Sequence, residues 1–134
     1  MTVRRGRAEL AIADTSLFIA LEPKLALAGA PPQQIAVSVV TIGELRLGVL
    51  TATDGPARAR RLETVSRAEA FDPLPIDSGV AHAWATLRLA LRDQGLRMPL
   101  NDSWIAATAI AHHLPVVAQD ADYDGIPGLR VIRV

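Results

Sequence analysis

Short apolar runs, each followed by polar residues, set the strongest limit on how this chain can fold. Residues 10–13, 35–37 and 114–118 have the length of strands rather than helices and contain only apolar residues, and a further strand is expected over 129–134. Strands of this kind are buried on both faces, which is typical of a parallel sheet covered by helices. Longer segments with helix-capping residues lie between them. The alternation predicts an α/β protein with three layers, α/β/α, around a mostly parallel central sheet.

The size and composition of the chain indicate what kind of protein it is. A length of 134 residues fits one domain, and a hydrophobic content of 50% is typical of a globular protein. The chain has no cysteine, which excludes disulfides, thiolate catalysis and cysteine-bound zinc. No apolar run has the length of a membrane span or a signal peptide. We therefore expect a single domain over residues 1–134 and a cytoplasmic location.

Acidic residues follow two of the predicted strands. Asp14 comes directly after the first strand, and Asp120 and Asp122 come shortly after the third. Because sites in open parallel sheets form beyond the carboxyl ends of the strands, we expect these acids to share one edge. Glu44 and Asp102 lie near the starts of two predicted helices, where they can face the same edge.

These acids also have ordinary structural explanations. Asp102 can cap the helix predicted to follow it. Glu44 stands three residues after Thr41, which is the spacing of a capping box. Asp120 and Asp122 fall in a string that is rich in turn-forming residues. Each acid taken alone is therefore compatible with a structural role.

The combination of acids nevertheless predicts a metal site. Clustered carboxylates repel one another, and a bound cation offsets that repulsion. Mg²⁺ and Mn²⁺ prefer carboxylate and water oxygens, and the sequence offers no cysteine and no paired histidine among these acids. Such an ion can activate water and offset charge on a phosphoryl group. The acids therefore predict metal-dependent cleavage of a phosphodiester.

Four stretches of the sequence resemble PIN-domain ribonucleases, and most closely the VapC toxins of bacterial toxin–antitoxin systems. They are ADTSLFIA, VVTIGELRLGVL, PLNDSWIAATAIAHHLPVVAQDADYD and the terminal GIPGLRVIRV. Together they span essentially the whole chain in the order that the family shows. The resemblance implies a single PIN domain over residues 1–134 and the toxin of a type II system. It also implies a Mg²⁺-dependent endoribonuclease that cuts RNA with metal-activated water, with Mn²⁺ as an alternative ion.

The resemblance also implies roles for individual residues. The acids that match the family's catalytic, metal-binding pocket are Asp14, Glu44, Asp102 and Asp120. Thr15 or Ser16 resembles the hydroxyl residue that supports the first acid. Ala118 stands where the family often has Thr or Ser, two positions before its last acid. The fourth position is therefore the weakest match, and Asp122 is a substitute for Asp120 or a companion to it.

The resemblance implies partners as well. VapC proteins are similar in forming homodimers and in being held inactive by a VapB antitoxin whose tail enters the acidic pocket. We therefore expect a homodimer, a cognate VapB-type antitoxin in a toxin–antitoxin hetero-oligomer, and an RNA substrate.

Several basic and aromatic residues have two interpretations each. Arg46, two residues after Glu44, can bind RNA phosphates beside the metal or be a solvated helix residue. The arginines of the helix predicted over 54–69 can line an RNA path, bind an acidic partner or form a solvated face; they are Arg58, Arg60, Arg61 and Arg67. Trp104 can stack on a base or anchor the core, and Trp84 is expected in the core or at a dimer interface. The histidines are expected to be structural or solvent-facing; they are His82, His112 and His113.

Two other functions are compatible with a small parallel α/β fold. A phospho-acceptor receiver domain needs a lysine near its last strands, but the only lysine, Lys24, lies early in the chain. A non-catalytic RNA- or protein-binding PIN-like domain with a degenerate metal site is disfavoured because all four acids are present.

Overall fold

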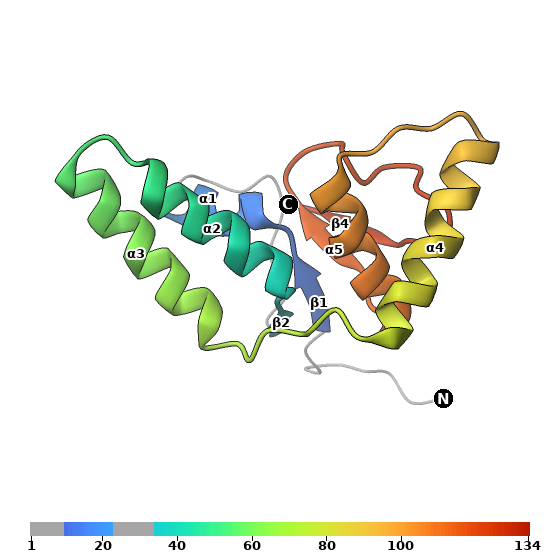
Figure 1. Cartoon of the computed structure of the whole chain (residues 1–134), viewed down its shortest axis with the longest axis horizontal. Helices are drawn as coiled ribbons and strands as arrows, with labels where there is room; N and C mark the ends of the chain where they lie inside the picture. The colour runs from blue at the N-terminus through green and yellow to red at the C-terminus, as the bar shows by residue number, and fades with distance from the viewer. Residues whose placement is uncertain (1–9, 23–33) are drawn as a thin grey trace.

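A four-stranded parallel sheet forms the centre of the protein in the computed structural model, which describes residues 10–22 and 34–134 (Figure 1). Lys24 lies outside the described residues. The strands, in their order across the sheet, are β2 (Gln34–Ala36), β1 (Leu10–Ala13), β3 (Val116–Ala118) and β4 (Val131–Arg133). All three pairings are parallel. The predicted parallel α/β fold is confirmed, although strand ends differ by one or two residues from the predicted ranges 35–37, 114–118 and 129–134.

Helices cover both faces of this sheet, so the protein has three layers. They are α1 (Thr15–Leu21), α2 (Val39–Thr51), α3 (Gly55–Glu69), α4 (Ser78–Asp93) and α5 (Leu100–Ala111). Figure 1 shows α2 and α3 on one side of β1, and α4 and α5 on the other. The helices α2 and α3 pack closely against each other, as do α4 and α5.

Alternate residues of the central strands bury themselves in two separate cores. Ala11 and Ala13 of β1 and Val117 of β3 pack with α1, α2 and α3. Ile12 of β1 and Val116 of β3 pack with α4 and α5. The two-residue period of a strand directs neighbours to opposite faces, and here both faces are covered. This explains why the strand sequences are apolar at successive positions.

Three of the helices begin directly after residues whose side chains cap them. Ser38, Asp54 and Asp77 each accept a backbone N–H from the first turn of α2, α3 and α4 respectively. Gly95 follows α4 with φ +68°, a left-handed conformation that favours glycine and ends the helix. Residues 71–76 begin in a turn, where Asp72 has φ +57°, and continue as an irregular segment with one isolated bridge, from Leu74 to Ser38.

The start of α5 differs from its prediction. The helix begins at Leu100, and its N-cap position is Pro99, which makes no side-chain cap. Asp102 therefore lies inside the first turn, and the explanation of Asp102 as a simple N-cap is wrong. Proline fixes φ near the value of a helix entry and needs no N–H partner, so it can begin a helix without a capping side chain.

No helix within residues 10–22 and 34–134 is long and apolar enough to cross a membrane.

We predict that Ile12→Ala destabilises the protein strongly, because Ile12 is fully buried between β1 and the α4–α5 layer. The expected loss of unfolding free energy is about 2–5 kcal/mol, the range for large-to-Ala changes in a core. Leu47→Ala is the control, since Leu47 is 60% exposed on α2, and its expected effect is within about 0.5 kcal/mol. Urea unfolding measures both, and equal losses would contradict the assignment of the core.

Candidate metal centre

Asp14 is a buried carboxylate fixed from several sides. It stands at the end of β1 and caps α1, and it is only 5% exposed. Its Oδ2 accepts hydrogen bonds from the backbone N–H of Ser16 at 3.2 Å and from the Ser16 hydroxyl at 2.5 Å. Its Oδ1 accepts one from the Tyr123 hydroxyl at 2.6 Å. The Asp14 backbone N–H donates to the Val117 carbonyl at 3.0 Å, which continues the β1–β3 pairing to the site.

Glu44 is joined to the start of α1 by hydroxyl groups. The Thr15 hydroxyl donates to Glu44 Oε1 at 2.5 Å, and the hydroxyls of Thr15 and Thr41 lie 3.0 Å apart. Asn101 of α5 donates its side-chain N–H to Glu44 Oε2 at 3.3 Å. Because Ser38 is the N-cap of α2 and Thr41 lies inside the helix, the capping-box explanation of Glu44 is wrong. Glu44 instead faces the edge of the sheet where Asp14 lies.

The pKa of Asp102 shows that it lies close to other acids. It is partly buried in the first turn of α5. Burial, followed by the negative charges of Asp14, Asp122 and Glu44, raises the pKa of the Asp102 carboxyl from 3.8 to about 7, although the Tyr123 hydroxyl acts in the opposite direction. Four acids therefore interact across one small region, from the end of β1, from α2, from the first turn of α5 and from the loop after β3.

Tyr123 was not identified from the sequence as part of this region. It is fully buried, and its hydroxyl donates to Asp14 Oδ1. The same hydroxyl also lies within hydrogen-bonding reach of the Asp102 carboxylate. Burial and then the Asp14 charge raise the pKa of Tyr123, so it stays a protonated donor. One feature of the sequence could have indicated this role: Tyr123 is the only tyrosine of the chain and stands among acids. A buried tyrosine needs a partner for its hydroxyl.

Asp120 and Asp122 occupy different environments. The Asp120 carboxylate accepts the backbone N–H of Asp122 at 3.0 Å, which is the geometry of an Asx turn. Both residues are exposed, but Asp122 is the one whose charge raises the pKa of Asp102. The structure therefore brings Asp122 toward the cluster and gives Asp120 a turn-forming contact.

The other residues singled out in the sequence lie outside this cluster or keep structural contacts. Arg46 is exposed on α2, and all three histidines are exposed. Three arginines of α3 make intramolecular contacts: Arg58 with the Ala52 carbonyl, Arg61 with Glu22, and Arg67 with Glu63. These contacts favour the interpretation of α3 as a solvated, structural face.

The donor set of the cluster suits a hard divalent cation. It consists of carboxylate oxygens, and the pKa of Asp102 is raised first by burial and then by neighbouring negative charges, which a cation would offset. Within the described residues, no three Asp, Glu or His side chains already stand in a complete ligand geometry. The hydrogen bonds to Asp14 and Glu44 leave further lone pairs on each carboxylate for a metal. The chemistry of the donor set therefore fits a hard divalent cation.

Known proteins are similar to this chain in sequence and in fold. The PIN-domain family model matches residues 11–129. Ribonuclease VapC4 of Mycobacterium tuberculosis is 49% identical over 139 residues, covering 100% of both chains. Ribonuclease VapC5 of the same organism is 43% identical, covering 92% of this chain and 94% of that protein.

A solved structure agrees with these relatives. The crystal structure of VapBC-5, a member of the VapBC family of toxin–antitoxin systems from Mycobacterium tuberculosis, aligns with a TM-score of 0.83 at 42% identity. The alignment covers 93% of this chain and 98% of that chain. This chain therefore belongs to the PIN-domain family, within its VapC group.

Proposed function

We propose that this protein is a divalent-metal-dependent endoribonuclease and the toxin of a type II toxin–antitoxin pair. The observation that carries the proposal is the cluster of Asp14, Glu44 and Asp102 at the carboxyl edge of the parallel sheet. RNA as the substrate is supported by the relatives named ribonuclease VapC4 and ribonuclease VapC5. The presence of the acids in one electrostatic cluster disfavours the alternative of a non-catalytic PIN-like binding domain.

We infer that Mg²⁺ is the ion, with Mn²⁺ as a substitute. Asp14, Glu44 and Asp102 would hold it, and Asp122 is a better candidate than Asp120 for a fourth ligand because the Asp120 carboxylate accepts a hydrogen bond in its own turn. When bound, the ion supplies Lewis-acid chemistry that activates water and offsets charge on the phosphoryl group.

The side chains of the protein position the acids and control their charge. Ser16 and Tyr123 fix the two oxygens of Asp14, and Thr15 fixes one oxygen of Glu44. Without a cation the carboxylates would repel a phosphate placed beside them, so positioning the bond to be cut at the acids depends on neutralising them. We expect in-line attack by water to leave a 5′-phosphate and a 3′-hydroxyl.

We propose a VapB-type antitoxin as the partner, in a hetero-oligomer that contains a homodimer of this chain. Support comes from the VapBC-5 structure, which belongs to a toxin–antitoxin system. The acidic cluster would attract a basic side chain of the antitoxin. Co-purification with a small DNA-binding protein encoded beside this chain tests the pairing.

Asp14→Asn should abolish cleavage, because it removes a buried negative charge, while its one oxygen can still accept from Ser16 or Tyr123 and its amide N–H can donate to the other hydroxyl. The assay is cleavage of total RNA by the purified chain with Mg²⁺, and EDTA should stop the wild-type reaction. We expect a loss of at least about 100-fold, as in other electrostatic centres.

Asp120→Asn is the matched control for this experiment. It makes the same chemical change in an exposed turn residue, and it should keep most of the activity. Normal cleavage by Asp14→Asn, or cleavage by the wild type in EDTA, would contradict the proposed mechanism.

Asp102 should make the metal-free protein less stable as the pH rises from about 4 to about 7. Its pKa is about 7 in the folded protein, against 3.8 for an unperturbed carboxyl, so the folded state binds more protons in this interval. Asp102→Asn stays neutral and should melt higher than the wild type at pH 8, and the difference should shrink toward pH 4. Thermal melting in EDTA measures this, and an equal melting temperature of both proteins at pH 8 would refute it.

A further inference from the structure

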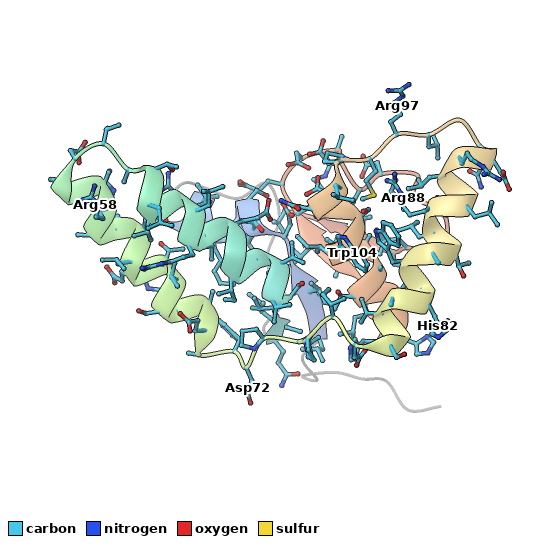
Figure 2. All side chains as sticks on the ribbon, in the orientation of Figure 1. Arg58, Asp72, His82, Arg88, Arg97 and Trp104 are labelled. Atoms are coloured by element: carbon cyan, nitrogen blue, oxygen red, sulfur yellow. The ribbon has the colours of Figure 1, made fainter. Side chains whose placement is uncertain are left out.

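A cavity lined by arginines lies at the end of α4 and the loop that leads to α5. Its volume is about 570 Å³, within the range of ligand pockets. Its charged lining consists of Arg88, Arg92 and Arg97. Figure 2 shows Arg88 on α4 and Arg97 on the loop, both on the half of the molecule that α4 and α5 form. The cavity shares no lining residue with the carboxylate cluster, and the loop that lines it leads directly to α5, the helix that carries Asp102.

These arginines have little charge compensation from the part of the chain that the structure describes. Arg92 approaches only Asp93, at 3.7 Å with both side chains exposed, which is a weak pair. No described carboxylate pairs with Arg88 or Arg97. The cavity therefore concentrates positive charge on a chain whose formal net charge is zero.

A stacked pair of tryptophans supports one of the three arginines. The rings of Trp84 and Trp104 lie 4.3 Å apart between centroids and 5° from parallel. Trp84 donates its indole N–H to the Ser103 hydroxyl at 3.0 Å, which fixes the pair. Arg88, one turn along α4, lies over the Trp84 ring with its guanidinium carbon 5.6 Å from the centroid. A guanidinium held in this way loses less conformational freedom when it binds a ligand.

The same residues connect the cavity to the candidate metal centre. Asn101 donates to Glu44, and Trp104 lies three residues further along the same face of α5. Trp104 stacks on Trp84, which in turn lies beneath Arg88. The α5 residue that contacts Glu44 and the α5 residue that stacks on Trp84 therefore lie within one turn of each other.

We propose that the arginine cavity binds the phosphodiester backbone of the RNA strand on one side of the bond that is cut. This inference rests on the proposed ribonuclease function and adds a second binding site to it. Guanidinium groups bind phosphate oxygens in a bidentate manner. The apolar lining of the cavity consists of Leu91, Leu96 and Met98, and Leu96 is the one of them exposed enough for a ribose or base to pack against. A peptide of acidic residues alone would pair with the charges but leave this apolar surface uncovered, and the relatives are named ribonucleases, so the observations favour RNA.

RNA binding by the Asp14→Asn chain, in EDTA and without cleavage, tests the proposal. The ligand is a fluorescein-labelled single-stranded RNA, and anisotropy gives its Kd. In that background, Arg88→Gln/Arg97→Gln should raise the Kd roughly tenfold. It should also lower the slope of log K against log salt by about 1.4, at about 0.7 per phosphate contact of a single strand.

Arg58→Gln/Arg67→Gln is the matched control, because it removes the same charge from α3, where both arginines make intramolecular contacts. It should change neither the Kd nor the salt slope appreciably. Tryptophan emission is a second readout, since the only two tryptophans form the stacked pair beside the cavity. RNA should change this emission in the Asp14→Asn chain and not in the Arg88/Arg97 variant. If that variant fails to fold, Arg97→Gln alone provides the test, because Arg97 is exposed on a loop.

Equal RNA binding by the two double variants would overturn the proposal. Displacement of RNA by a poly-glutamate peptide of equal charge, as effective as unlabelled RNA, would assign the cavity to an acidic protein segment and would also overturn it. If the wild-type chain with Mg²⁺ bound RNA through the cavity but cleaved none, the result would contradict the proposed function and leave this site standing. The two failures are therefore distinguishable.

Discussion

Asp14 is a buried carboxylate at the end of the central strand, and the arrangement around it follows from the need to stabilise its charge. Hydrogen bonds from Ser16 and Tyr123 satisfy both of its oxygens. A buried charge without such partners would destabilise the fold. These bonds do not remove the repulsion between Asp14 and its acidic neighbours, which adds to burial in raising the pKa of Asp102. The fold thus holds these carboxylates close together in spite of their mutual repulsion.

The parallel sheet explains why these acids meet. The strand β1 lies between β2 and β3, so its carboxyl end opens at the middle of one sheet edge. The helix α1 begins directly after Asp14, and its first two hydroxyls contact different acids, with Thr15 on Glu44 and Ser16 on Asp14. Asp102 enters from the opposite layer in the first turn of α5. Both helical layers therefore contribute to a site that neither could form alone.

The apolar runs and the acid after the first strand predicted the sheet and the position of Asp14, because both depend on local pattern. The start of α5 was predicted too late, since Asn101 and Asp102 look like capping residues while Pro99 gives no side-chain signal. Tyr123 was missed because its contact with Asp14 spans 109 positions of the sequence. The choice between Asp120 and Asp122 depends on a turn, which only the folded backbone distinguishes.

The cavity on α4 shows a further limit of local pattern. Its arginines lie on one helix and the following loop, and nothing in their spacing reveals that a stacked tryptophan pair adjoins them. The pairing of Trp84 with Trp104 arises because α4 and α5 pack tightly. Trp104 therefore packs between helices, which agrees with its interpretation as a core anchor.

The most direct test of the central claim is the position of a metal ion. Crystals of the chain grown above pH 7, where Asp102 is ionised, can be soaked with Mn²⁺ and measured at the manganese absorption edge. The account predicts an anomalous peak between the carboxylates of Asp14 and Asp102, and its absence from crystals of Asp14→Asn. A fully soaked wild-type crystal with no peak there, or with manganese bound only at the Asp120 turn, would contradict it.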